Sequence, residues 1–173
     1  LKGTAYALNN SFASGGTTSI TNSGTVTKNA TGNITSTGAF STTGDVNLAA
    51  NITTTDTNLT IGGNLVIAEA ATPTLSTGAG TAGNVLVSGT TNGTTGGVAE
   101  TLTVQAGTGT ATFTGNVGNN ANGTELEALT ITNAAATTFS GTLDLANALT
   151  QTNAATGTTT FTGAVAVGSA DLK

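Results

Sequence analysis

The sequence predicts an all-β protein in which similar segments stack as the coils of a parallel β-helix. Three observations lead to this prediction. The segment TATFTG around Phe113 is written again twice downstream, its residues alternate between apolar and polar, and the composition favours short strands and tight turns. An antiparallel β-sandwich, in which the repeats would be hairpins, is the alternative fold.

The repeat is clearest in the second half of the chain. The phenylalanines of its three copies follow one another at spacings of about 26 and 22 residues, a period typical of stacked structural repeats. In a parallel β-helix, equivalent residues of successive coils are hydrogen-bonded neighbours about 4.8 Å apart. We therefore expect seven to eight coils and two columns of like side chains, one of Phe113, Phe139 and Phe161 and one of Leu102, Leu129 and Leu149.

Each repeat alternates strictly. In TATFTG, Ala111 and Phe113 occupy one set of alternate positions, and threonines occupy the other. A period of two is that of a strand with one buried and one solvated face. The pattern predicts that Phe113 faces the interior and that its threonine neighbours face solvent.

The composition excludes several classes of function. Only 6% of the residues are charged, the net charge is −5, and the only cations are Lys2, Lys28 and Lys173. Because nucleic acids and anionic membranes are bound through clustered Lys and Arg, we expect neither as a partner. No apolar run reaches the ~18–20 residues of a membrane-spanning helix. Cysteine is absent, so disulfides contribute nothing.

The chain divides into two parts by regularity. Residues 1–32 are the least regular and are expected to form a cap or an extended arm, and residues 33–173 form the repeat solenoid, most clearly over 100–168. Two polar stretches, 90–97 and 116–124, are expected to project as loops. The chain starts at Leu1 rather than Met, which suggests a processed form or a segment of a longer protein.

The repeats resemble those of a known class of protein. The text LTV…TATFTGNVG, LTITN…TTFSGTL and TGTTTFTGAV is similar to the imperfect repeats of large bacterial surface proteins, among them autotransporter passengers and filamentous-haemagglutinin-like adhesins. The resemblance covers roughly residues 33–168. It implies a right-handed parallel β-helix displayed outside the cell.

Residues for catalysis are scarce. Without His or Cys, the usual general base, thiol nucleophile and zinc ligands are missing, so we expect neither an enzyme nor a cofactor. The carboxylates are scattered along the chain. Glu125 and Glu127, two residues apart, are the one weak candidate for a paired-carboxylate or calcium site, beside their interpretation as a solubilising acidic loop.

Two polar patterns allow more than one interpretation. Several Asn-x-Thr or Asn-x-Ser triplets, for example at Asn33, Asn51 and Asn58, match the glycosylation signal but are also expected from the composition. The outward threonines, repeated by stacking, would form a flat lattice of the kind that ice-binding β-helices present. The other interpretation is that threonine is a strand-forming residue on a solvated face.

These observations favour an extracellular structural protein of the bacterial cell surface that associates with itself through its termini into a filament or layer. The second hypothesis is an adhesin segment whose loops bind a host surface or a glycan. A secreted glycan-active β-helix enzyme or an ice-binding protein is the third.

Overall fold

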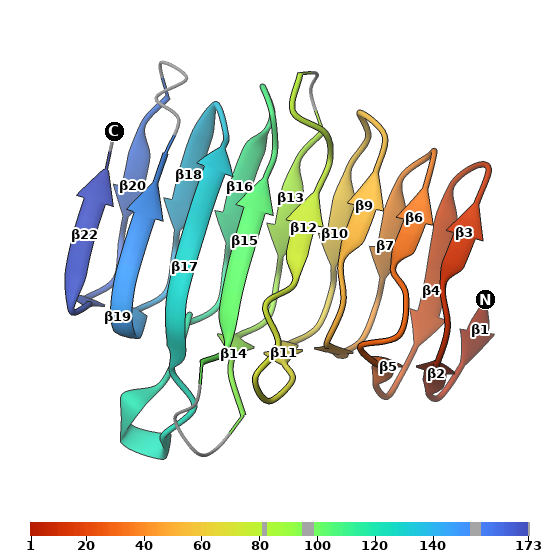
Figure 1. Cartoon of the computed structure of the whole chain (residues 1–173), viewed down its shortest axis with the longest axis horizontal. Helices are drawn as coiled ribbons and strands as arrows, with labels where there is room; N and C mark the ends of the chain where they lie inside the picture. The colour runs from red at the N-terminus through yellow and green to blue at the C-terminus, as the bar shows by residue number, and fades with distance from the viewer. Residues whose placement is uncertain (81–82, 95–98, 153–156, 173) are drawn as a thin grey trace.

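The protein is a parallel β-solenoid of about seven turns. Its computed structural model describes residues 1–80, 83–94, 99–152 and 157–172. The coils stack along one axis, so that the N-terminus and the C-terminal strand lie at opposite ends of a rod (Figure 1). Every strand pair among the described residues is parallel, which confirms the β-helix and excludes the antiparallel sandwich.

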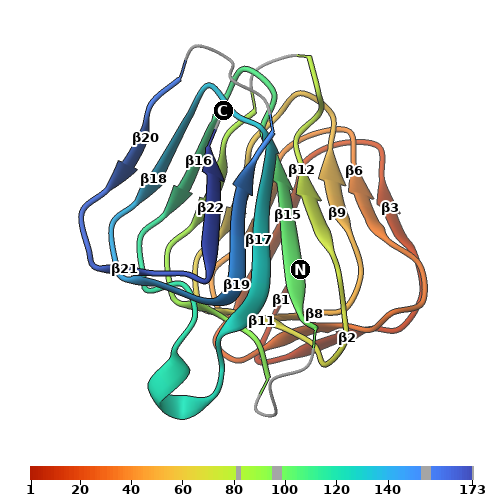
Figure 2. The same ribbon diagram turned by 60° about the vertical axis from the view of Figure 1, so that its left-hand side comes forward.

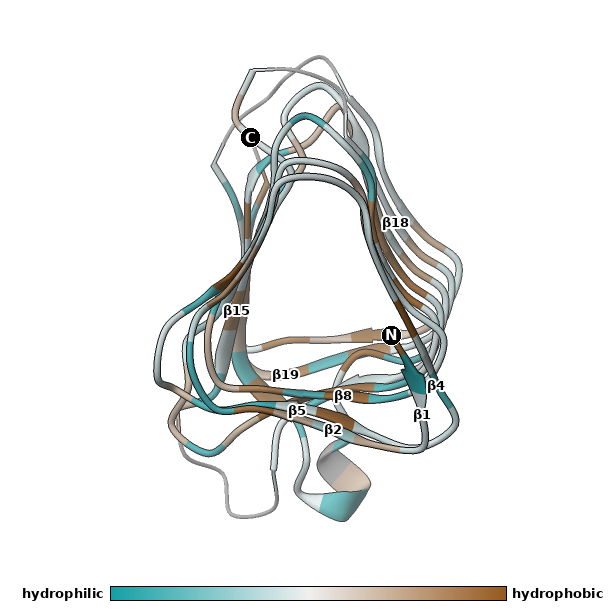
Figure 3. Cartoon of the chain, turned by 90° about the vertical axis from the view of Figure 1, so that its right-hand side faces the viewer, coloured by the Kyte–Doolittle hydropathy of each residue, from teal (hydrophilic) through white to brown (hydrophobic). Residues whose placement is uncertain are grey.

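Viewed along the rod, the coils form a rounded triangle whose three sides are three sheets (Figures 2 and 3). The first sheet has eight strands: β1 (Lys2–Gly3), β4 (Thr18–Asn22), β7 (Phe40–Thr42), β10 (Leu59–Ile61), β13 (Val85–Val87), β16 (Thr110–Phe113), β18 (Ala136–Phe139) and β20 (Thr159–Phe161). The second has five: β2 (Tyr6–Leu8), β5 (Val26–Lys28), β8 (Val46–Leu48), β11 (Leu65–Ile67) and β14 (Thr91–Asn92).

The third sheet has nine strands. Seven follow one another along the rod: β3 (Phe12–Ser14), β6 (Ile34–Ser36), β9 (Ile52–Thr54), β12 (Thr74–Ser76), β15 (Thr101–Gln105), β17 (Leu126–Asn133) and β19 (Leu143–Gln151). The last two, β21 (Val165–Ala166) and β22 (Ser169–Leu172), both pair with β19. Strand β19 turns the corner between two sides, so its first residues continue the second side towards β21. Among the described residues, one 3₁₀ turn, η1 (Asn120–Asn122), lies outside the rod (Figure 1).

The interior is a set of columns made by equivalent residues of successive coils. Phe113, Phe139 and Phe161 are in register, with ring centroids 5.2 and 5.3 Å apart and rings within 6° of parallel. Leu102, Leu129 and Leu149 form the second predicted column, and all three are buried. Both columns are confirmed, because a parallel ladder places identical residues over one another.

The corners of the triangle are tight. At Gly115 a Cβ atom would lie 2.4 Å from the backbone oxygen of Gly89 in the preceding coil. Coils differ in length: equivalent residues are 18 positions apart at Asn33 and Asn51 but 29 apart at Ser76 and Gln105. The strands of longer and shorter coils pair in the same columns, so the additional described residues lie in the segments between strands.

Residues 1–32 differ from the cap or extended arm expected from the sequence. They form β1 to β5, which pair with the following coil in the same register as the rest of the rod. Strands β4 and β5 coincide with the sequence segments 18–22 and 24–28, in which apolar and polar residues alternate. The sequences of β2 and β3 do not alternate in this way, because the exposed middle residue of each, Ala7 or Ala13, is itself apolar. Strand β1 has two residues, both exposed.

Candidate functional site

Ladders of asparagine side chains run along the corners of the rod. Each Oδ1 accepts a hydrogen bond from the backbone N–H at the equivalent position of the next coil. On one corner Asn58 accepts from Asn84 at 3.0 Å, and Asn84 accepts from Thr110 at 2.9 Å. Because backbone N–H groups at a corner have few other partners, these bonds hold successive coils in register.

The same device occurs at the other two corners. Asn33 accepts from Asn51 at 3.2 Å, and Asn51 accepts from Thr74 at 2.8 Å. On the third corner Asp45 accepts from the N–H of Asn64 at 2.7 Å, so a carboxylate takes the place of an amide. Further along that corner, Asn64 and Asn116 accept from Thr90 and Thr142.

The sequence contains a signal for these ladders that repeat analysis alone misses. Each ladder asparagine stands directly before an inward apolar residue that begins a strand or a bridge. The pairs are Asn33-Ile34, Asn51-Ile52, Asn58-Leu59, Asn64-Leu65, Asn84-Val85 and Asn116-Val117. Three of these asparagines, Asn33, Asn51 and Asn58, belong to the glycosylation-like triplets. Their amide oxygens are engaged in stacking, which gives those triplets a structural explanation.

The two carboxylates singled out from the sequence have different surroundings. Glu127, near the start of β17, accepts a hydrogen bond from Nδ2 of Asn147 in the next coil. Glu125 precedes the strand, and its Oε2 is buried without a hydrogen-bond donor among the described residues. The structure therefore does not engage the pair in a common contact, and the proposed paired-carboxylate or calcium site stays a prediction.

A different carboxylate lies close to Glu125. Glu100 is only 2% exposed and accepts a hydrogen bond from the hydroxyl of Thr94. Gly93 separates the two segments: a Cβ atom there would lie 3.0 Å from the Glu125 backbone oxygen and 3.5 Å from the Glu100 carboxyl carbon. Sequence reasoning missed Glu100, because nothing in the local pattern distinguishes it from a solvated acid.

These residues lie at a projection on the second side of the triangle, to which the described segments 93–94, 99–100 and 118–125 contribute (Figures 1 and 3). The N–H of Gly93 donates to Thr124 O, and the N–H of Glu127 donates to Glu100 O, both at 2.9 Å. Both loops expected from the sequence therefore contribute to it, although residues 95–98 of the first lie outside the described residues. In the described part of the chain no three His, Cys, Asp or Glu residues gather as a metal-binding group.

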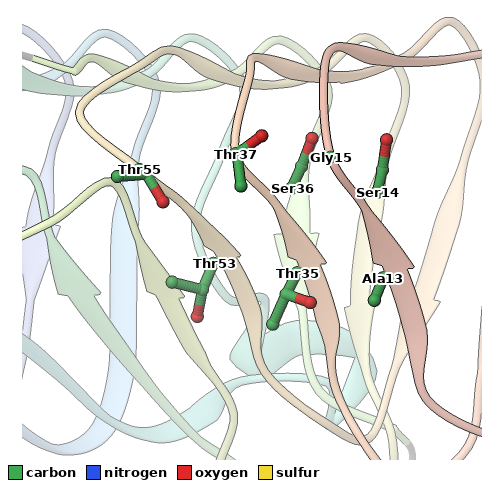
Figure 4. Close-up of a pocket in the computed structure, with 8 residues that line it drawn as sticks. All are labelled: Ala13, Ser14, Gly15, Thr35, Ser36, Thr37, Thr53 and Thr55. Carbon is green, nitrogen blue, oxygen red and sulfur yellow. The ribbon is translucent and has the colours of Figure 1, made fainter.

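A hollow of about 350 Å³ lies on the outer surface of the third sheet in the first coils. Figure 4 shows Ala13, Thr35 and Thr53 side by side across three neighbouring strands, with Thr37 and Thr55 above them. The lining offers hydroxyl groups and methyl groups but no ionisable side chain. Such a surface can form hydrogen bonds, whereas acid–base chemistry needs a titratable group.

One buried cation lies inside the solenoid. Lys28 ends β5, is 1% exposed, and donates from Nζ to the backbone oxygens of Asn29 at 2.9 Å and Thr31 at 2.8 Å. Both acceptors are neutral, and burial lowers the pKa of the Lys28 ammonium group. Its neighbours in the column, Leu8 and Leu48, are apolar. Lys28 therefore differs from them in donating hydrogen bonds to the backbone oxygens of the turn that follows β5, which an apolar side chain could not do.

The ends of the rod differ from its sides. Among the described residues, the exposed large apolar side chains are Leu1 at 59%, Val165 at 46% and Leu172 at 47%. Leu1 lies in the first coil, and Val165 and Leu172 lie in the last one. The apolar surface left open to solvent is thus at the two ends of the stack.

The fold and these surfaces define the protein as a parallel β-solenoid whose polar side chains serve stacking. No known family model, curated protein or solved structure matches the sequence significantly. Across the described ranges, no helix has the length and apolar character needed to cross a membrane.

Proposed function

We propose that this protein is an extracellular structural component of the bacterial cell surface that assembles end to end into a filament or layer. The observation that carries the proposal is the exposure of Leu1, Val165 and Leu172 in the end coils. The outermost strands of a sheet also present backbone groups that pair with further strands. A contact between unlike ends does not close on itself, so it generates an open fibre.

The test is the concentration dependence of association for the 173-residue chain at neutral pH. Light scattering should show mass growing with concentration, and electron microscopy should show unbranched fibres as wide as one solenoid. A chain that stays monomeric up to high concentration, with no fibres in the images, contradicts the proposal.

A second function is favoured by the projection to which the described segments 93–94, 99–100 and 118–125 contribute. A projection from a regular rod places polar loop surface at one position, as expected of an adhesin that binds a host surface or a glycan. Replacing residues 119–124 by a short Gly-Ser turn should abolish binding to cells or glycans while leaving association unchanged. If binding persists in that variant, the projection is not the binding surface.

A further inference from the structure

The apolar columns of the interior reach both ends of the rod in the same order. The column of Phe113 begins at Ile20 and ends at Phe161. Leu1 lies beside Ile20, because the N–H of Thr21 donates a hydrogen bond to the backbone oxygen of Leu1 at 2.8 Å. In the second sheet, the column that begins at Tyr6 ends at Val165.

The third sheet repeats this arrangement. Its column begins at Phe12 and continues through Ile34 and Ile52. The last two members of the column are Gln151 and, at the end of the rod, Leu172. Each of the three columns therefore has an apolar side chain at both of its ends, one on each side of the triangle. Leu1, Tyr6 and Phe12 lie at one end, and Phe161, Val165 and Leu172 lie at the other.

Charge is also distributed by position along the rod. The first 44 residues contain Lys2 and Lys28 and no carboxylate, whereas all eight Asp and Glu residues lie from Asp45 onwards. The first coil contains Lys2, whereas the C-terminal segment contains both Asp171 and Lys173, so side-chain charge does not decide which ends meet. Strand direction does: contact between unlike ends keeps the strands parallel, as in every pair within the described rod, and contact between like ends would make them antiparallel.

We propose that the last coil of one molecule pairs in register with the first coil of a second copy of this chain, so that the solenoid continues across the junction. Strands β20, β21 and β22 of one copy lie beside β1, β2 and β3 of the next. Phe161 then contacts Leu1, Val165 contacts Tyr6, and Leu172 contacts Phe12. The inference rests on the proposed end-to-end assembly and adds to it the partner, the polarity and the register.

The register can be tested by disulfide cross-linking, because the natural chain contains no cysteine. Ala7 and Ala166 are exposed, face outward, and occupy equivalent positions of the first and last coils. In register their Cα atoms would be about 4.8 Å apart, within the range of a disulfide. The double variant A7C/A166C should therefore give a ladder of covalent multimers on mild oxidation. The two positions lie at opposite ends of one molecule, so the bond must join two molecules.

The matched control shifts the register by two residues. In A7C/A164C the cysteines would be about 8 Å apart, too far for a disulfide. Ala164 is exposed like Ala166, so the thiol is accessible in both variants. We expect non-covalent fibres from both variants and covalent ladders from A7C/A166C alone. Far-UV circular dichroism verifies that both variants fold.

The outcomes separate this inference from the proposed function. Fibres in which A7C/A164C cross-links as well as A7C/A166C overturn the register and leave end-to-end assembly standing. Covalent dimers of the single variant A166C overturn the polarity, since they join like ends. If neither double variant forms fibres or multimers, both the inference and the proposed assembly are overturned.

An apolar-to-acidic change provides an independent measurement. Leu172→Asp places a carboxylate at the end of the Phe12 column, where pairing would bury it, and should abolish association in light scattering. Leu172→Ile keeps the apolar contact and should associate like the natural chain. Because Leu172 is already exposed in one copy, neither change removes core packing from the single molecule. Unchanged association of Leu172→Asp overturns the inferred contact.

Discussion

The middle and the ends of the rod use the same residue pattern with different results. Phe113 and Phe139 are almost completely buried, whereas Phe161, one coil further along the same column, is only partly buried. Leu1, at the opposite end of that column, is largely exposed. The interior of a coil is therefore completed by its two neighbours, and its stability depends on them, as in other repeat proteins.

Truncation of one ring in the Phe column should show the largest difference between middle and end. Phe139→Ala removes a ring stacked on both sides and should lower the free energy of unfolding by about 3–5 kcal/mol. Phe161→Ala, stacked on one side, should cost clearly less. Guanidinium unfolding followed by circular dichroism measures both. Equal losses would mean that neighbouring coils do not complete the core.

A methyl group added at a corner tests backbone contact between coils. Gly115→Ala would place its Cβ 2.4 Å from Gly89 O, so we expect a loss of about 1–3 kcal/mol from overpacking. Gly15→Ala, in the first coil, meets no atom within 4 Å and is the control. Thermal unfolding compares the two. A Gly115→Ala protein as stable as the natural chain would show that the corners are loose.

Removal of one ladder amide should have a moderate effect. Asn84 accepts from both the N–H and the hydroxyl of Thr110, at 2.9 and 3.2 Å. Asn84→Ala should cost about 1 kcal/mol because the side chain is exposed and water replaces part of the interaction. Asn84→Asp keeps the acceptor and should retain most of the stability, as Asp45 does at its own corner. Hydrogen exchange of the Thr110 amide gives the local measurement.

The smallest effect concerns the pH dependence contributed by Lys28. Its pKa is lowered in the folded protein, so between that value and the ordinary value of about 10.4 the unfolded chain binds more protons. Stability contributed by this residue should therefore rise with pH in that alkaline window and be constant below it. Lys28→Met, a side chain of similar length, should lack the rise. Denaturant titrations of both proteins at several alkaline pH values measure the difference, and parallel curves would contradict the assignment.

The sequence predicts which side chains stack in the interior better than it predicts where the solenoid begins. The Phe and Leu columns follow from repeated text, since identical residues in a parallel ladder lie over one another. The first coil is not visible in the sequence because the exposed residues between its inward side chains, Ala7 and Ala13, are apolar, so apolar and polar residues do not alternate. Glu100 could not be found, since its burial depends on a contact with a segment about 25 residues further along the chain.

The direction of the hydrogen bonds determines how the rod responds to force. The ladders between coils run along the rod axis, so tension between Leu1 and the C-terminal strand pulls the coils apart one ladder at a time instead of shearing them. Each coil of 18 to 29 residues that detaches would release about 60–100 Å of extended chain. A molecule stretched in this way should lengthen in steps, with the shorter coils at both ends of the rod giving smaller steps than the longer coils in its middle.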